Sequence, residues 1–229
     1  MSNIEKRPEE MTFKDKLSQF LHSYKNVLIG IGGVLLVVLI GTAIYTAVHQ
    51  NRLEDSSRQA EELISTYEDW QNAEEEEKKA ELEQQIREQS ASIQDSYSGM
   101  FAAQRAKLVL GQIEHAKENW EKAAGHFLEI ADSTPKSYLA PVALMSAAVC
   151  KEEIGSYQEA ISHYQRIFDQ YGDTAPEAPH ALFSIGRLYE RQDEKDAALD
   201  AYNQLIDNFS ASNWTKLARD RIIYLNSQG

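Results

Sequence analysis

The sequence predicts an all-α chain in which one N-terminal transmembrane helix is followed by a superhelix of stacked helical hairpins and a C-terminal capping helix. Two observations predict this class: an uncharged apolar segment near the N-terminus, and a pattern of small and aromatic residues that returns after 37 and 38 residues. The patterns divide the chain into a head, a span, a charged helical lead-in with a weak first repeat, and the clear repeats with their cap. These parts cover residues 1–25, 26–49, 50–97 and 98–229.

The apolar segment is Val27–Val48, which contains no charged residue. A helix of this length reaches about 33 Å, enough to cross a hydrocarbon core of about 30 Å. A cleaved signal peptide is the alternative, but its apolar core usually has about 7–15 residues and ends at a small-residue cleavage site. The segment is longer and no Ala-x-Ala follows it, which favours an uncleaved anchor.

Basic residues near the ends of the span predict its orientation, because such residues tend to stay on the cytoplasmic side. Only Arg52 and Arg58 follow the span closely. Five basic residues precede it: Lys6, Arg7, Lys14, Lys16 and Lys25. We therefore expect the N-terminus in the cytoplasm and the C-terminal domain on the outer side of the membrane.

Composition excludes several classes of partner and chemistry. Acidic residues outnumber basic residues by 36 to 23, giving a net charge of −13, and such a surface repels the phosphate backbone of nucleic acids. The single cysteine, Cys150, excludes an intrachain disulfide. We interpret it as a small apolar residue of a helix rather than a reactive thiol.

The segment Arg52–Gln94 contains no Gly or Pro and predicts two helices joined by a turn at Asn72–Ala73. Apolar residues near helical spacing mark the two faces: Leu53, Ala60, Leu63, Ile64, Tyr67 and Trp70, then Leu82, Ile86 and Ile93. The acidic run Glu74–Glu77 is interpreted as a solvated turn and first helical turn rather than a binding tail. Arg58–Ile93 is interpreted as the weak first repeat.

Three clear repeats follow, each expected to be a pair of antiparallel helices, A and B. A small residue on helix B recurs after 37 and 38 residues, as Ala123, Ala160 and Ala198. An aromatic residue follows each by four positions, as Phe127, Tyr164 and Tyr202. We expect the small residue to let helix A pack closely and the aromatic residue to fill the gap to the next repeat. One hairpin cannot bury its own apolar face, so the repeats are expected to stack.

The segment from Asn213 to Leu225 is expected to form the capping helix that closes the open end of the stack. Its apolar stripe would consist of Leu217, Ile222 and Leu225. Asn208-Phe-Ser and Asn213-Trp-Thr match glycosylation sequons. Ser212 or Asn213 as the N-cap of the helix explains the second match more simply.

The repeats resemble the tetratricopeptide family. Its pair of an aliphatic and a small residue late in helix A is present as Leu110-Gly111 and Ile185-Gly186, and is reduced to Ala147-Ala148 in the middle repeat. The glycine between the helices occurs only as Gly155, and the closing proline only as Pro135. The period exceeds the family's roughly 34 residues, so the connections are longer. This resemblance implies stacked hairpins that bind other proteins.

The whole layout resembles the YfgM-like family of bacterial inner-membrane proteins, which have a cytoplasmic head, one span and a periplasmic tetratricopeptide domain. The match covers the basic head, Val27–Val48, the acidic lead-in, the repeats and the closing segment Trp214–Arg221. It implies an accessory role at the SecYEG translocon, with translocon subunits, periplasmic chaperones and exported chains as partners. The repeats also look like those of BamD and of the Tol–Pal-associated YbgF protein. The uncleaved anchor and the lack of a lipid-acceptor cysteine near the N-terminus argue against those two.

In tetratricopeptide proteins the A helices line the concave face. Carrying over the second, fifth, ninth and twelfth positions of helix A gives twelve residues, of which the last in the second and third repeats are Glu152 and Glu190. The other ten are predicted to form a protein-binding groove: Arg105, Leu108, Gln112, His115, Val142, Met145, Val149, His180, Phe183 and Arg187. Leu108, Met145 and Phe183 occupy one position in successive repeats, as an apolar stripe or as core between hairpins. The Lys and Asn pattern that clamps a C-terminal carboxylate is absent there, so an apolar or unfolded segment is the expected ligand.

The sequence shows no pattern of a catalytic, cofactor or metal site. The six histidines do not pair at i+3 or i+4, and there is no Cys-x-x-Cys, nucleophile elbow or phosphate loop. We expect no enzyme, but a membrane-tethered protein-binding scaffold that assists export or recruits chaperones at the translocon. The alternative is a structural tether or envelope-assembly scaffold that acts through self-association of the span and the helix over residues 52–73.

Overall fold

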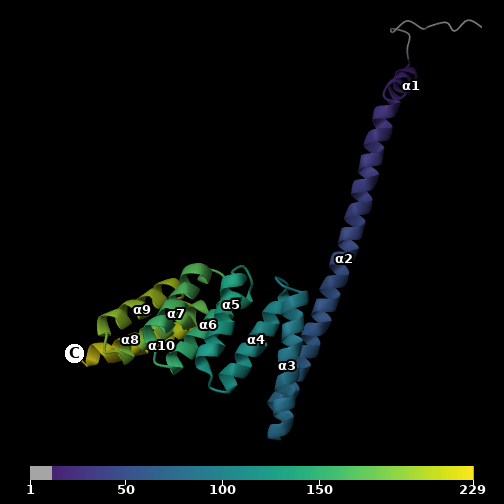
Figure 1. Cartoon of the computed structure of the whole chain (residues 1–229). Coiled ribbons are helices and arrows are strands. Elements are labelled where there is room, and N and C mark those ends of the chain that lie inside the picture. Colours follow the sequence, from purple (N-terminus) through teal and green to yellow (C-terminus); the bar gives the residue numbers. More distant parts are fainter. Residues whose placement is uncertain (1–11, 229) are drawn as a thin grey trace, which may run out of the picture. The chain divides into compact units, whose positions relative to one another are not determined.

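The computed structural model describes residues 12–228, and in that range every regular element is an α-helix, as predicted (Figure 1). The helices are α1 (Phe13–Ser23), α2 (Lys25–Asn72), α3 (Glu76–Ser96), α4 (Phe101–Ala116), α5 (Trp120–Ser133), α6 (Leu139–Glu153), α7 (Tyr157–Tyr171), α8 (Ala178–Arg191), α9 (Lys195–Asn208) and α10 (Asn213–Ser227). The chain divides into two units; Glu54 ends the first and Asp55 begins the second.

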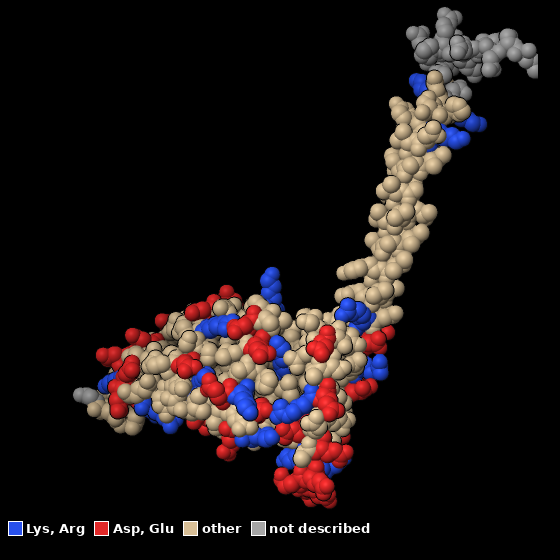
Figure 2. All heavy atoms as spheres, in the orientation of Figure 1, with Lys and Arg blue, Asp and Glu red and all other residues tan. Residues whose placement is uncertain are grey.

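The described part of the first unit consists of α1 and the N-terminal part of α2. Every residue from Val27 to Val48 is exposed, and an 18-residue window of α2 has a mean hydropathy of 2.8 with none of it buried. By length and composition α2 could cross a membrane. Figure 2 shows this part of α2 as a long surface without Lys, Arg, Asp or Glu. The boundary expected after residue 49 falls inside α2, which continues through it without a break.

The second unit begins with a helix pair formed by the end of α2 and by α3. One buried cluster contains residues of this pair and of α4: Ala60, Leu63, Trp70, Leu82, Ile86, Ile93, Tyr97, Ala102, Ala106, Val109, Leu110 and Ile113. The turn occupies residues 73–75, beside the expected position, and Glu76 and Glu77 lie in the first turn of α3. Acidic side chains gather at this exposed tip (Figure 2).

Three hairpins follow, formed by α4 with α5, α6 with α7, and α8 with α9 (Figure 1). The small residues expected on their B helices, Ala123, Ala160 and Ala198, are fully buried. The aromatic residues four positions later are at most 2% exposed: Phe127, Tyr164 and Tyr202. Both sets therefore belong to the core that holds the hairpins together.

Phe127 shares a buried cluster with Ala143 and Ala147 of the next hairpin, in agreement with the position expected for the aromatic residue between repeats. Two of the three aromatic rings also pack inside their own hairpin. A Cβ atom added to Gly111 would lie 2.5 Å from Cε1 of Phe127, and one added to Gly186 would lie 2.5 Å from Cε1 of Tyr202. Each ring thus lies against a glycine of its own hairpin. The missing side chain leaves room for the ring between helix A and helix B.

The turn inside each hairpin has the same left-handed backbone although its residue differs. Glu118, Gly155 and Asp193 have φ angles of 58°, 76° and 60°. In the first turn the amide of Asn119 donates to the carbonyl of Glu114 at 2.8 Å, and the other two turns repeat this bond. Only the second hairpin therefore has the family's glycine between its helices, as Gly155. Glu118 and Asp193 adopt, in the other two turns, a backbone conformation that suits glycine better.

The carboxylate of Glu190, which is 12% exposed, ties the third hairpin to α10. The hydroxyl of Tyr202 donates to Glu190 at 2.5 Å, and Arg221 of α10 donates to the same carboxylate. Burial would raise the pKa of Glu190, but Arg221 and Tyr202 outweigh it and hold the pKa below its usual value. The carboxylate is therefore charged in the folded protein and links two successive elements of the stack.

The second hairpin uses the same arrangement. The hydroxyl of Tyr164 donates to Glu152 at 2.6 Å, and Arg187 of α8 donates to Glu152 at 2.6 and 2.7 Å. Burial and the neighbouring carboxylate both raise the pKa of Tyr164, so its hydroxyl stays protonated and remains a donor. One carboxylate again joins helix B of its own hairpin to helix A of the next.

The capping helix α10 begins as expected, since the Ser212 hydroxyl accepts a hydrogen bond from the amide of Trp214 at 3.2 Å. Ile222 and Leu225 pack against the core, but Leu217 is 45% exposed and does not belong to the buried stripe. The adjacent Ala218 is buried in its place. A small side chain there lets α10 approach the last hairpin closely.

The glycine contact predicts a loss of stability on Gly186→Ala. The added Cβ collides with the buried ring of Tyr202, and overpacking of this kind costs about 1–3 kcal/mol. The preference of a helix for Ala over Gly, about 1 kcal/mol, offsets part of this cost, so we expect the free energy of unfolding to fall by up to about 2 kcal/mol. Urea unfolding of the full chain in detergent, followed by circular dichroism, measures it.

The matched control is Gly125→Ala, in the interior of α5, where an added Cβ meets no atom within 4 Å. Only helix propensity acts there, so the free energy of unfolding should rise by up to about 1 kcal/mol. An equal rise in the free energy of unfolding in both variants would contradict the close contact between Gly186 and the ring of Tyr202.

The charged state of Glu190 predicts a pH dependence. Its folded pKa is below its unfolded pKa of about 4.3, so its contribution is complete above that pH and is lost as the pH falls through the folded pKa. Glu190→Gln should lower the free energy of unfolding at pH 7 by about 1–3 kcal/mol, with a smaller further loss on acidification than the unchanged chain. Urea unfolding from pH 7 to pH 3 tests this. The exposed Glu153→Gln is the control, and parallel pH curves for Glu190→Gln and the unchanged chain would contradict the account.

Candidate protein-binding face

The ten residues predicted to form a groove lie on the A helices. Arg105, Leu108, Gln112 and His115 are on α4, Val142, Met145 and Val149 are on α6, and His180, Phe183 and Arg187 are on α8. Arg187 is exposed and the other nine are half-buried. On each helix the neighbouring stripe faces the core; Ala143, Leu144 and Ala147 of α6 are fully buried. The ten residues therefore follow the edge of the core on three successive helices.

Near the N-terminal end of the stack, two of the ten residues contact neighbours in the chain. The ring of His115 meets Trp120 edge-on, with 4.8 Å between their centroids. The guanidinium of Arg105 lies 5.7 Å from the ring centroid of Phe101. These contacts hold both side chains at the border of α4 and reduce the surface that they offer to a ligand.

At the other end, α10 covers the part of the groove on α8. Trp214 stacks on His180 with 4.1 Å between centroids and 3° between planes, and its centroid lies 5.2 Å from that of Phe183. Burial, and then the charge of Arg187, lower the pKa of His180, which keeps the stacked ring neutral at pH 7. Phe183 thus belongs largely to an aromatic cluster under the cap.

The predicted apolar stripe of Leu108, Met145 and Phe183 is half-buried, and each of its residues packs against a buried cluster. The stripe is therefore partly core between the hairpins and partly accessible surface. The surface least used by the chain itself lies on α4 and α6. Within residues 12–228, the amide of Gln112 has no side-chain hydrogen-bond partner. We name this surface the A-helix face; it consists of Leu108, Gln112, Val142, Met145 and Val149.

A hollow of about 570 Å³ adjoins the A-helix face at Val142. Prolines and tyrosines of two connections and of the adjoining helix ends form its apolar wall: Pro135, Tyr138, Pro141, Tyr171 and Pro176. The hydroxyl of Tyr171 donates to the carbonyl oxygen of Pro135 at 2.9 Å and joins the connections. Sequence reasoning missed this hollow. The available signal was the period above 34 residues, because the extra residues lie in these connections.

Glu177 also lines the hollow. Within the described residues its Oε2 atom is buried without a hydrogen-bond partner, which is costly for a carboxylate oxygen. The hollow thus combines an apolar wall with one acidic residue, and its apolar part suits an apolar peptide segment.

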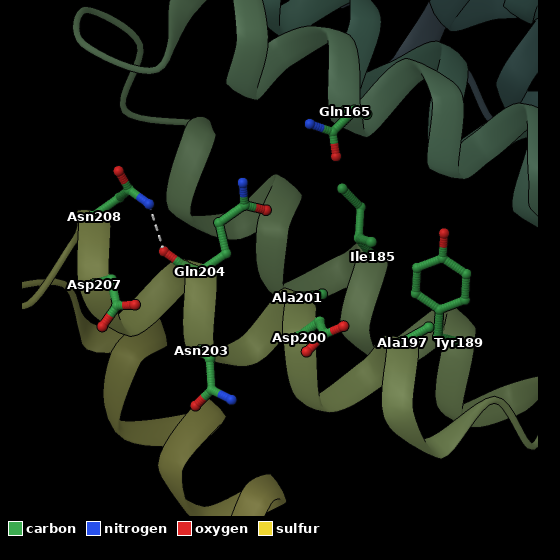
Figure 3. A pocket seen from close by; sticks show the side chains of 10 residues that line it. All are labelled: Gln165, Ile185, Tyr189, Ala197, Asp200, Ala201, Asn203, Gln204, Asp207 and Asn208. Carbon is green, nitrogen blue, oxygen red and sulfur yellow. Dashed lines mark hydrogen bonds between the residues drawn. The ribbon is translucent and has the colours of Figure 1, made fainter.

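A second hollow, of about 560 Å³, lies along the B helices between α7, α8 and α9 (Figure 3). Ile185 and Ala201 provide apolar atoms, but polar side chains dominate its lining: Gln165, Asp200, Asn203, Gln204, Asp207 and Asn208. The Asn208 amide donates to the carbonyl oxygen of Gln204 at 2.8 Å (Figure 3). Its two carboxylates and four amides do not match an apolar ligand.

In the described range the single cysteine is a core residue, and the side chains able to bind metals are not grouped into a site. Cys150 is fully buried in the cluster of the first two hairpins, and burial raises the pKa of its thiol to about 11. It behaves as a small core residue, as expected. Among residues 12–228 there is no group of three or more His, Cys, Asp or Glu side chains placed to hold a metal ion.

Curated proteins with related sequences cover part of the chain. It is 34% identical to the TPR repeat-containing protein of Treponema pallidum (strain Nichols) over 129 residues, which is 56% of this chain and 53% of that protein. It is 29% identical to the response regulator aspartate phosphatase J of Bacillus subtilis (strain 168) over 119 residues, or 47% of this chain and 31% of that protein. The chain therefore spans about half the length of the first relative and about a third of the second.

Solved structures show the same fold. A tetratricopeptide repeat protein from Parabacteroides merdae ATCC 43184 is similar with a TM-score of 0.54 and 16% identity, over 75% of this chain and 61% of that one. The TPR-like repeats of a putative kinesin light chain from Podosopora anserina are similar with a TM-score of 0.56 and 13% identity, over 74% and 88%. The tetratricopeptide repeat-like domain family matches residues 18–226. The chain therefore belongs to the tetratricopeptide repeat-like domain family, whose fold is a scaffold for protein–protein interaction.

Proposed function

We propose that this chain is a membrane-tethered adaptor that binds other proteins through its A-helix face on the outer side of the cytoplasmic membrane. In this role it assists protein export or recruits periplasmic chaperones at the SecYEG translocon. The observation that carries the proposal is the run of half-buried apolar residues on α4 and α6 beside a hollow with an apolar wall. Its partners are translocon subunits, chaperones or exported chains.

The length and composition of α2 support the tether. Its apolar part is exposed from Val27 to Val48, and such a surface in water would be strongly unfavourable over this length. Five basic residues before the span and two after it support an N-terminus in the cytoplasm. The repeat domain would then work on the outer side, close to chains that leave a translocon.

The chemistry of the A-helix face supports an apolar, extended ligand. Leu108, Val142, Met145 and Val149 offer flexible and branched apolar surface, and Met in particular adapts to varied side chains. Gln112 supplies a polar contact for a peptide backbone. A surface with few fixed polar groups selects weakly among sequences, as an adaptor for many exported chains requires.

Self-association is the second candidate, because α10 leaves apolar side chains uncovered. Leu217, Ile223 and Tyr224 are exposed on α10, with Ile223 at 69%. A second copy could cover them and continue the stack. This arrangement would make the protein a structural tether for envelope or cell-division assembly rather than an adaptor.

Photo-crosslinking in native membranes tests the adaptor. A photoreactive phenylalanine at Val149 should form adducts with translocon subunits, chaperones or exported chains, whereas one at the exposed Glu76 should not. The pair Met145→Glu and Val149→Glu should reduce the adducts of a probe at Val142 at least tenfold, which corresponds to about 1.4 kcal/mol. Adducts only with a second copy of the chain would favour the structural tether.

The control for this variant is Ile154→Glu, which changes an exposed apolar residue just beyond the end of α6. It should leave the adducts unchanged. If Ile154→Glu and the pair reduce the adducts equally, the A-helix face is not the binding surface.

A further inference from the structure

The short helix α1 presents an apolar face that is exposed to solvent. Its apolar residues and the adjoining tyrosine are Phe13, Leu17, Phe20, Leu21 and Tyr24. At 100° per residue these five positions fall within an arc of about 100°. Their side chains are 45–83% exposed. Such a face is unfavourable in water and requires an apolar environment outside the described chain.

Lysines border this face on both sides. On the same helical projection Lys14 lies along one edge and Lys16 along the other. An open hollow of about 440 Å³ on the first edge is lined by Lys14, Leu17, Leu21 and Lys25, among others. Lysine stems can lie on an apolar surface while their ammonium groups reach outward to anions. An apolar face with lysines at its edges is typical of a helix that lies in the surface of an anionic membrane.

The position of α1 in the chain identifies the surface that covers it. α1 ends at Ser23 and the uncharged segment of α2 begins at Val27. Tyr24 interrupts the helix between α1 and α2, although its amide still donates to Phe20 at 3.0 Å and its carbonyl oxygen accepts from Leu28 at 2.8 Å. An interruption at this point lets the chain change direction where the span would leave the membrane. With the span inserted, the membrane surface is within a few residues of the C-terminal end of α1.

We propose that α1 lies in the surface of the cytoplasmic leaflet, with its apolar face among the acyl chains and its lysines on anionic phospholipid headgroups. The inference rests on the proposed membrane anchor but not on the binding role of the repeats. It gives the N-terminal segment a function of its own: α1 fixes the depth and rotation of the span and makes the anchor sensitive to the charge of the leaflet.

Spin-label accessibility on the full chain tests the proposal. Nitroxide labels are placed singly at Leu17, Gln19 or Leu36 in a Cys150→Ser background, and the protein is reconstituted in vesicles containing about one third phosphatidylglycerol. Collisions with oxygen report on the membrane, and collisions with a neutral nickel chelate report on water. A label at Leu17 should favour oxygen, and a label at Gln19, on the polar face, should favour the chelate.

The label at Leu36 distinguishes a failure of the membrane anchor from a failure of the proposal that α1 lies in the membrane surface. If Leu36 favours oxygen but Leu17 and Gln19 are equally open to the chelate, the anchor holds and the surface helix is wrong. If Leu36 is itself open to the chelate, the span is not in the membrane and the surface helix fails with it. A protected Leu17 beside an open Gln19 and a protected Leu36 supports the proposal.

The charge of the headgroups is tested by Lys14→Gln combined with Lys16→Gln. One lysine at an anionic surface changes the ratio of bound to free helix about fivefold, so the pair should lower this ratio roughly 25-fold. Vesicles of phosphatidylcholine alone should have a similar effect on the unchanged protein. The control pair, Lys136→Gln with Lys216→Gln, changes exposed lysines of the second unit and should have no effect. If the ratio of bound to free helix changes neither with the lysine pair nor with the charge of the lipid, the assignment to anionic headgroups is wrong.

Discussion

The contact between a small residue of helix A and an aromatic ring of helix B is the constraint on which the repeat domain depends. In the first and third hairpins the small residue is a glycine, and the ring occupies the space that a side chain would need. This contact sets the distance between the two helices of a hairpin. It also places the carboxylate of Glu190, one turn after Gly186, within reach of the hydroxyl of Tyr202. Close packing inside the hairpin thus positions Glu190 to accept hydrogen bonds from its own hairpin and from the next element.

That polar link explains how the hairpins stack in one register. Glu152 and Glu190 each accept from a tyrosine of their own hairpin and from an arginine of the next element, which is α8 for Glu152 and the capping helix α10 for Glu190. A carboxylate that is buried and charged is stable only with such donors, so a shift of one helix against the next would leave it unpaired. The link at Glu152 also fixes which residues of α6 and α8 share one face.

The sequence was sufficient for the features that every repeat must have. Alanines and aromatic residues at a fixed spacing revealed the hairpins. The alanine positions accept only small side chains, and the aromatic positions accept only large ones. The turns were harder to recognise: Glu118 and Asp193 adopt the left-handed backbone that Gly155 marks openly. No propensity of a single residue reveals that conformation when surrounding hydrogen bonds impose it.

Long-range packing limited the prediction of the candidate site. Phe183 occupies the expected helical position, but Trp214 lies more than thirty residues later and covers it. The hollow beside Val142 is formed by two connections distant in the sequence, and its prolines carry no periodic signal. Leu217 looked like part of a buried stripe, whereas the neighbouring Ala218 makes the close approach. Each difference arises from a contact between elements rather than from a local pattern.

Amide hydrogen exchange on the full chain in lipid nanodiscs tests most directly whether the A-helix face is the working surface. The protein is measured alone and with a permanently unfolded exported polypeptide. Our account predicts slower exchange in α4, α6 and the connections around the 570 Å³ hollow, with no change in α9. Slower exchange confined to α10, or no change in any helix at saturating polypeptide, would contradict it.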